Sequence, residues 1–221
     1  ILCGANGKMG KVIQDVVSKR ENCEIIAGVD IHTESSAFPV YKTIYDVKEE
    51  ADVIIDFSNP ALLQSLLDFA VNKKMPVVIA TTGYDENQKK MIEDASKETP
   101  VFFTYNMSIG INLLANLAKK AVSVLGEDFD IEIVEKHHNQ KIDAPSGTAL
   151  MLADAICEET ENPMNYEYDR HSKREKRTKH EIGMHAVRGG TIVGEHEIIF
   201  AGRDEIITLS HSARSKEVFA V

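Results

Sequence analysis

The stretch "ILCGANGKMGKVI" (residues 1–13) places Gly4, Gly7 and Gly10 between an apolar run and a helical pattern. Glycines at such a corner allow a tight turn and let a pyrophosphate approach the backbone, and the following helix N-terminus stabilises its charge. Taken alone the spacing is a weak signal, because Ala5 stands where the strict GxGxxG pattern begins and any tight strand-to-helix corner can contain three glycines. An ordinary corner is therefore the alternative.

An acidic residue strengthens the glycine signal. Asp30 lies twenty residues beyond Gly10, at the end of the next apolar run, where a carboxylate accepts hydrogen bonds from ribose hydroxyls. No arginine follows Asp30, although Lys8, Lys11 and His32 supply positive charge. We therefore expect a dinucleotide site that binds NADH well and leaves NADPH open.

The first hundred residues alternate apolar runs with amphipathic stretches. The runs at 24–30, 52–57, 76–80 and 101–105 predict buried parallel strands, and the patterns at about 60–72 and 85–97 predict helices between the last three. This order predicts an α/β domain with a Rossmann-like, doubly wound parallel sheet. The segments "ATTG" (80–83) and "TYNMS" (104–108) follow strands, at the sheet edge that binds ligands, although each could be a capping turn.

The pattern changes after residue 106. A long apolar helix is expected over 109–126, an alternating strand over 128–138 and a further helix from about 146. Three strand-like runs between 181 and 212, separated by "RGG" and "AGRDE", predict an antiparallel ribbon. We expect a dinucleotide-binding domain at 1–105, which the chain could rejoin at 213–221. We expect an α+β substrate-binding and oligomerisation domain at 106–212.

Composition limits the partners and the cellular location that we expect. The net charge of -10 argues against a nucleic-acid partner, whose phosphates would be repelled. Three widely spaced cysteines give neither a disulfide framework nor a thiolate metal site, which indicates a reducing cytoplasm. The start of the sequence lacks a signal-peptide pattern, and no apolar run is expected to cross a bilayer, so we predict no membrane partner.

A second stretch, "EKHHNQKIDAPSGTA" (135–149), concentrates reactive groups. His137 and His138 end a strand, so their side chains should point to opposite faces, and Lys141 can fold back toward either. The helix that opens at Ser146 offers the backbone N–H groups of its first turn to a carboxylate.

Two other interpretations of this stretch remain. One is structural: hydrogen-bonded histidines, a surface lysine, and a helix capped by Ser146 or Asp143. The other is a metal site formed by His137, His138 and Asp143, which is disfavoured because the histidines face apart and Lys141 would repel a cation. Four complementary features in succession favour a carboxylate-binding catalytic site without a metal.

These motifs carry a family resemblance. "EKHHNQKIDAPSGTA" matches the signature E-x-H-H-x-x-K-x-D-A-P-S-G-T throughout. With "GANGKMG", "DFSNP", "ATTG", "YNMSIGIN" and "RGGTIVGEHEIIFAG", it makes the sequence resemble the dihydrodipicolinate reductases of bacterial lysine and diaminopimelate synthesis. The resemblance covers nearly the whole chain.

The resemblance implies hydride transfer from NADH or NADPH to a cyclic unsaturated dicarboxylate, giving tetrahydrodipicolinate, in a cytoplasmic homotetramer formed through the substrate domains. It makes His137 the general acid, assisted by Lys141, which agrees with the chemistry of these side chains. The substrate-binding residues it implies are His138, Lys141, Ser146, Gly147 and Thr148. The cofactor-binding residues it implies are Gly4, Ala5, Asn6, Gly7, Lys8, Met9, Asp30, Phe57, Ala80, Thr81, Thr82, Thr104, Tyr105, Asn106 and Met107.

Two departures and two rivals qualify this interpretation. Ala80 stands where the family often has glycine, and Ile31 stands where many members carry an arginine, which leaves the preferred dinucleotide open. One rival is another dehydrogenase of amino or imino dicarboxylates, such as an aspartate dehydrogenase. The other is a protein that senses NADH without turnover and has no need of His137 or Lys141.

Overall fold

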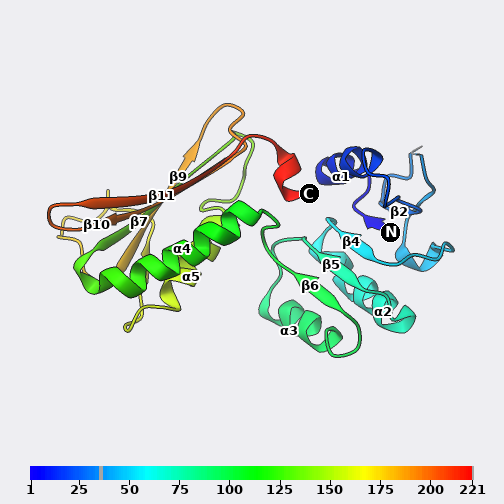
Figure 1. Cartoon of the computed structure of the whole chain (residues 1–221), viewed down its shortest axis with the longest axis horizontal. Coiled ribbons are helices and arrows are strands. Elements are labelled where there is room, and N and C mark those ends of the chain that lie inside the picture. Colours follow the sequence, from blue (N-terminus) through cyan, green and yellow to red (C-terminus); the bar gives the residue numbers. More distant parts are fainter. Residues whose placement is uncertain (35–36, 221) are drawn as a thin grey trace. The chain divides into compact units, whose positions relative to one another are not determined.

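The computed structural model describes residues 1–34 and 37–220, and the chain forms two compact units (Figure 1). The first unit contains Ile1–Met107 and the residues from Phe219 on, and the second contains Ser108–Val218. Each unit has its own apolar core, so each is described separately.

The first unit is built on a six-stranded sheet in the order β3-β2-β1-β4-β5-β6, and every pairing is parallel. The expected parallel strands are confirmed, although each is shorter than its apolar run. The strands are β1 (Leu2–Cys3), β2 (Gly28–Val29), β3 (Val40–Tyr41), β4 (Ile54–Asp56), β5 (Val77–Ile79) and β6 (Val101–Phe103).

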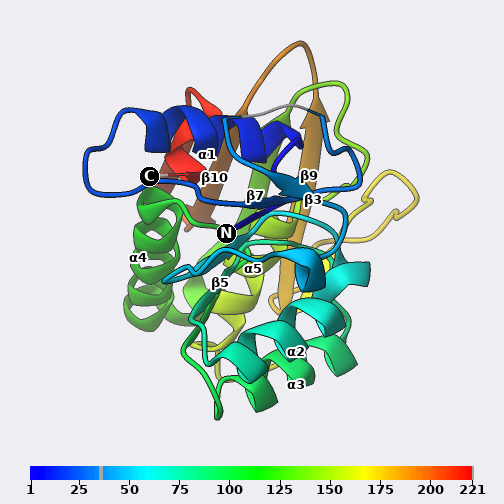
Figure 2. The same cartoon turned by 90° about the vertical axis from the view of Figure 1, so that its right-hand side faces the viewer.

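Helices cover both faces of this sheet, as the doubly wound prediction requires. Helices α2 (Leu63–Lys73) and α3 (Glu86–Ala95) lie side by side on one face, and α1 (Lys8–Ser18) lies on the other (Figure 2). Two single 3₁₀ turns, η1 (Ile44–Asp46) and η2 (Pro60–Leu62), complete the unit.

The local sequence explains where these helices begin. Asp85 and Gln88 form a capping box, each side chain bonding the other's backbone N–H, which fixes the start of α3. Asn59 caps the turn that leads into α2 by accepting from the Ala61 N–H. Both starts lie near where the sequence expected them.

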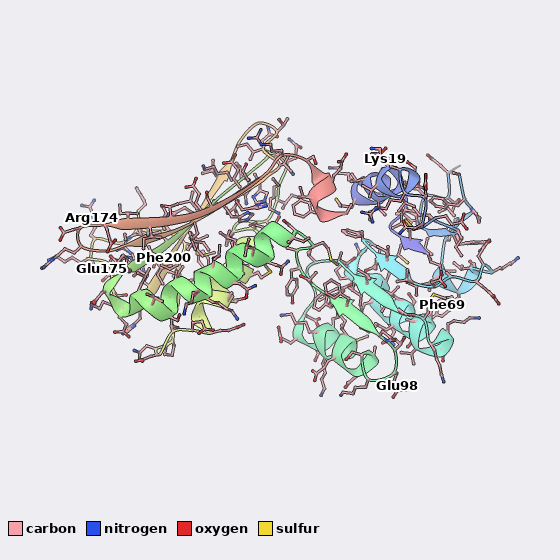
Figure 3. All side chains as sticks on the ribbon, in the orientation of Figure 1. Lys19, Phe69, Glu98, Arg174, Glu175 and Phe200 are labelled. Carbon is pink, nitrogen blue, oxygen red and sulfur yellow. The ribbon has the colours of Figure 1, made fainter. Side chains whose placement is uncertain are left out.

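The second unit packs two helices on one face of a five-stranded sheet in the order β11-β10-β7-β9-β8 (Figure 1). Alternate residues of β10 are buried, and Phe200, labelled in Figure 3, belongs to the core beneath the helices. The elements are α4 (Ile109–Leu125), η3 (Gly126–Asp128), β7 (Asp130–His137), α5 (Gly147–Cys157), β8 (Asn165–Glu167), β9 (Glu181–Arg188), β10 (Gly194–Ala201), β11 (Ile206–Ala213) and η4 (Lys216–Phe219).

The expected antiparallel ribbon is half wrong. Strands β10 and β11 are an antiparallel pair, but β9 pairs in parallel with β7 and β8, and β7 separates β9 from β10. The chain passes from β7 through α5 before β9 forms, which is the crossover that parallel strands need. Three consecutive strand patterns do not reveal that an earlier strand lies between two of them.

Helix α4 also corrects an expectation. Together with η3 it is long and apolar enough to cross a membrane, by length and composition alone, so the sequence does contain such a run. In the structure its residues Ile111, Leu114, Ala118 and Val122 are buried against the sheet. Burial accounts for this side of the helix only, because Leu113, Leu117 and Val124 on α4 are exposed.

Candidate functional site

The glycine turn of the first unit has a geometry that only glycine permits. Gly4 has φ = 77°, and a Cβ there would lie within 3.0 Å of the Phe57 carbonyl. A Cβ at Gly10 would come equally close to the carbonyl oxygens of Gly4 and Ala5. Backbone therefore packs directly on backbone where α1 leaves the turn.

The N-terminus of α1 and Asp30 flank the glycine turn. Gly7 is the N-cap of α1 and contributes no side-chain cap, so Lys8 and Met9 open a helix turn available to an anion. The Asp30 carboxylate accepts from the N–H groups of Asn6 (2.9 Å) and His32 (3.0 Å), which ties the end of β2 to the turn. These residues fit a diphosphate beside a ribose.

The remaining predicted cofactor residues follow strands at the carboxyl edge of the same sheet. Phe57 follows β4; Ala80, Thr81 and Thr82 follow β5; the segment 104–107 follows β6. The sequence missed Asp56, which is buried and accepts from the Ser58 N–H (3.2 Å) and, weakly, from the Tyr84 hydroxyl (3.4 Å). Burial raises the pKa of Asp56, and its bonds join two of these loops.

His137 ends β7 in the second unit, with its side chain only 12% exposed. Its Nδ1 lies 2.6 Å from Oε2 of Glu135. Its Nε2 lies against Gly194, where an added Cβ would come within 3.2 Å, so the ring fits there because this residue has no side chain. The imidazole is thus held at Nδ1 by Glu135.

Glu135 is fully buried and accepts three hydrogen bonds from two partners besides His137. Arg188 of β9 donates to both carboxylate oxygens at 2.7 Å, and the Ser146 N–H donates to Oε1 at 3.0 Å. Burial alone would raise the pKa of Glu135, but the bonds from His137 and Arg188 outweigh it and lower the pKa to about 2. Glu135 is therefore a permanent anion inside the domain.

His196 of β10 completes the inner wall. It is buried, its Nε2 lies 3.1 Å from the Ser146 hydroxyl, and its ring packs edge-on against His137 with centroids 5.2 Å apart. Burial and the neighbouring His137 lower the pKa of His196 to about 3, so this imidazole is neutral.

The predicted anion site lies at the start of α5. Ser146 is the N-cap and accepts from the Ala149 N–H (3.2 Å), so Ser146 rather than Asp143 caps the helix. A Cβ at Gly147 would meet nothing within 4 Å, which leaves this backbone, next to Thr148, open to a ligand. Lys141 pairs with Asp143 (2.9 Å), and its N–H donates to the carbonyl of His138, just beyond β7.

The two predicted sets of residues lie in different units: the cofactor-binding residues belong to the first unit and the substrate-binding residues to the second. Glu135, Arg188 and His196 are the site residues that sequence reasoning missed. Glu135 gave one signal, because it occupies an inward position of a strand whose other inward residues are Ile131 and Ile133. The described residues contain no group of three or more His, Cys, Asp or Glu side chains able to hold a metal ion.

Comparisons with known proteins agree on one family. A family profile described as dihydrodipicolinate reductase, N-terminus, matches residues 1–107, and one described as dihydrodipicolinate reductase, C-terminus, matches residues 110–221. The 4-hydroxy-tetrahydrodipicolinate reductase of Caldanaerobacter subterraneus subsp. tengcongensis is 57% identical over 99% of this chain and 87% of its own. The Clostridium tetani enzyme of the same name is 50% identical over 100% of this chain and 87% of its own.

Solved structures extend the likeness. A dipicolinate-bound dihydrodipicolinate reductase from Paenisporosarcina sp. TG-14 has a TM-score of 0.76 and 26% identity, covering 99% of this chain and 89% of that one. An aspartate dehydrogenase from Thermotoga maritima has a TM-score of 0.53 and 13% identity, covering 95% of this chain and 86% of that one. The second likeness concerns the fold alone.

Proposed function

The chain belongs to the dihydrodipicolinate reductase family and catalyses the NAD(P)H-dependent reduction step of lysine and diaminopimelate biosynthesis, and we propose that His137 supplies the proton. The observation that carries this proposal is the buried Glu135–His137 pair, which lies in the same unit as a helix start that suits a carboxylate. The substrate is 4-hydroxy-tetrahydrodipicolinate, a cyclic dicarboxylate that loses water and is reduced to tetrahydrodipicolinate.

The proton and the hydride come from different places. When bound, the dinucleotide supplies the hydride. His137 in its imidazolium form delivers the proton from Nε2 and keeps the Nδ1 proton toward Glu135, so the conjugated ring gains one hydride and one proton. The neutral imidazole then regains a proton from solvent.

The two substrate carboxylates need cationic and N–H donors in a protein whose net charge is -10. Lys141 is the proposed ammonium donor, and the start of α5 at Gly147 and Thr148 is the proposed backbone cradle. His138 and the Ser146 hydroxyl are the remaining proposed contacts. The relative of known structure binds dipicolinate, which has the same pair of carboxylates on a ring.

The first unit is proposed to hold the dinucleotide through the residues Gly4–Met9, Asp30, Phe57, Ala80–Thr82 and Thr104–Met107, which line the carboxyl edge of the sheet. Asp30 suits the free ribose hydroxyls of NADH, and the exposed Lys8 and His32 offer charge to the 2′-phosphate of NADPH. Both dinucleotides should therefore act as donors. The domains at 1–105 and 106–212 have the corresponding roles, and we expect the enzyme to act in the cytoplasm.

Turnover tests this function. Purified protein given freshly synthesised 4-hydroxy-tetrahydrodipicolinate should oxidise NADH and NADPH, followed by the loss of the reduced-nicotinamide absorbance, and the two rates rank the donors. Tight dinucleotide binding without oxidation would favour the sensor. Reduction of NAD⁺ by aspartate, without oxidation of NADH by 4-hydroxy-tetrahydrodipicolinate, would favour the rival dehydrogenase.

Replacing Lys141 by methionine should raise KM for the substrate by roughly tenfold, because one charge-assisted hydrogen bond to a carboxylate is lost. The affinity for NADH should not change, since Lys141 belongs to the second unit. Initial rates over a range of substrate concentrations, with NADH titrated separately, measure both quantities. An unchanged KM would remove Lys141 from the carboxylate site.

The homotetramer is proposed to form through the face of the second sheet that the helices leave open. Glu132, Val134, Lys136 and Ile199 belong to this face and are only partly buried in the single chain. Replacing Ile199 by aspartate should lower the mass measured by light scattering, because a charge in an apolar contact is costly to bury. Leu113→Asp, on the exposed side of α4, is the control that should keep the parent mass; equal masses for all three proteins would contradict the interface.

A further inference from the structure

The buried carboxylate of Glu135 contacts both parts of the proposed substrate site, which are His137 and the start of α5. Its Oε2 binds His137 Nδ1 and one Arg188 nitrogen, and its Oε1 binds the other Arg188 nitrogen and the Ser146 N–H. The proton donor and the N-cap of α5 therefore share one anchor, although they lie in different elements of the chain.

Arg188 extends this connection to the loop that carries Lys141. Beyond its fork on Glu135, one Arg188 nitrogen donates to the carbonyl of Asp143 (2.6 Å). The same segment pairs Asp143 with Lys141 through their side chains. A single guanidinium on β9 thus fixes the carboxylate behind His137 and the loop between β7 and α5.

We propose that Glu135, held in place by Arg188, is a positioning residue: it keeps the His137 imidazole oriented for proton delivery and aligns it with the carboxylate cradle at the start of α5. This inference rests on the proposed role of His137. The negative charge of Glu135 stabilises the imidazolium, and Arg188 offsets part of that charge while keeping the carboxylate fixed.

Other groups also face this pair and set its surroundings. They are Arg188 on β9, the neutral His196 on β10 with His211 of β11 behind it, and Lys141 and Asp143 in the loop after β7. Among these described neighbours Glu135 is the carboxylate in direct contact with the His137 ring. Changing Glu135 to glutamine therefore removes the main negative charge at Nδ1 while nearly preserving shape.

The test is the pH dependence of kcat in Glu135→Gln. We expect kcat at neutral pH to fall by about tenfold, and its decline on the alkaline side to begin roughly one pH unit lower, because the imidazolium loses its stabilising charge. Affinity for NADH should be unchanged. Glu132→Gln is the matched control: Glu132 lies on the same strand, also between an arginine (Arg177, 3.0 Å) and a histidine (His185, 2.8 Å), but on the opposite face, so its pH profile should match the parent.

A double mutant separates positioning from general support of the fold. If Glu135 acts through His137, Glu135→Gln should lower kcat little further in a His137→Gln background, whereas independent structural damage would multiply the two losses. Multiplied losses, or an unshifted pH profile in the single variant, would overturn the inference. Should Glu135→Gln not fold, Arg188→Lys tests positioning alone. It keeps both charges and loses the fork, so kcat should fall while the pH profile stays that of the parent, and an unchanged kcat would overturn the inference.

The failure of the proposed function is distinguishable from the failure of this inference. An inactive parent, or a His137→Gln variant as active as the parent, removes the function itself. Loss of activity in His137→Gln together with a parent-like kcat and pH profile in Glu135→Gln, or a parent-like kcat in Arg188→Lys, removes only the positioning role.

Discussion

Replacing His137 by glutamine should lower kcat by roughly 10²-fold or more, the loss expected when a general acid is removed. Glutamine fits a similar space and can still bond Glu135, but its amide does not release a proton near neutral pH. Steady-state rates with saturating NADH and substrate measure this loss, and fluorescence titration measures the affinity for NADH, which should stay the same.

The matched control for this variant is His185→Gln. His185 lies on the neighbouring strand β9, pairs with Glu132 as His137 pairs with Glu135, and is on the open face of the sheet. Its replacement should leave kcat within about twofold, since His185 lies on the opposite face of the sheet from His137. Equal activity of His137→Gln and the parent would exclude His137 as the acid.

Gly10→Ala should weaken the binding of NADH by roughly 30-fold or more. A Cβ at this position would meet the carbonyl oxygens of Gly4 and Ala5 at less than 3.0 Å, and backbone atoms cannot rotate away as a side chain can. Forcing the turn apart costs about 2 kcal/mol or more and moves the N–H groups that face the pyrophosphate. Titration of NADH followed by fluorescence tests this.

Gly189→Ala is the control for this substitution, because a Cβ at Gly189 meets nothing within 4 Å and this residue lies in the second unit. It should bind NADH as the parent does. Binding of dipicolinate to Gly10→Ala should also be retained if the damage is confined to the first unit. Parent-like affinity of Gly10→Ala for NADH would contradict the proposed dinucleotide turn.

The first unit was predictable because its signals are local. Buried parallel strands produce continuous apolar runs. The glycine turn and Asp30, which together indicate a dinucleotide ligand, lie within the first thirty residues. Strand β3 was missed because it has only two residues, Val40 and Tyr41, and both are half-buried. The place of β9 was missed because strand order depends on packing across the whole domain, which no local pattern encodes.

The candidate site also combines residues that a local motif predicts with residues that only long-range packing brings in. His137, Lys141 and the start of α5 come from one continuous motif, so the sequence brought them together. Arg188 reaches Glu135 across 53 residues, and His196 reaches Ser146 across 50. Those contacts depend on the register of β7 with β9 and β10, which the sequence alone did not supply. Their importance emerges only when the inward faces of three strands are seen together.

The central claim is that this chain moves a hydride from a nicotinamide to the ring of a cyclic dicarboxylate while His137 adds a proton. Mass spectrometry of the product made with NADH deuterated at both transferable positions tests it most directly. The account predicts tetrahydrodipicolinate carrying one deuterium per molecule, formed one for one with the NADH consumed, and almost none from His137→Gln. Product without deuterium, or NADH bound and never consumed, would contradict it.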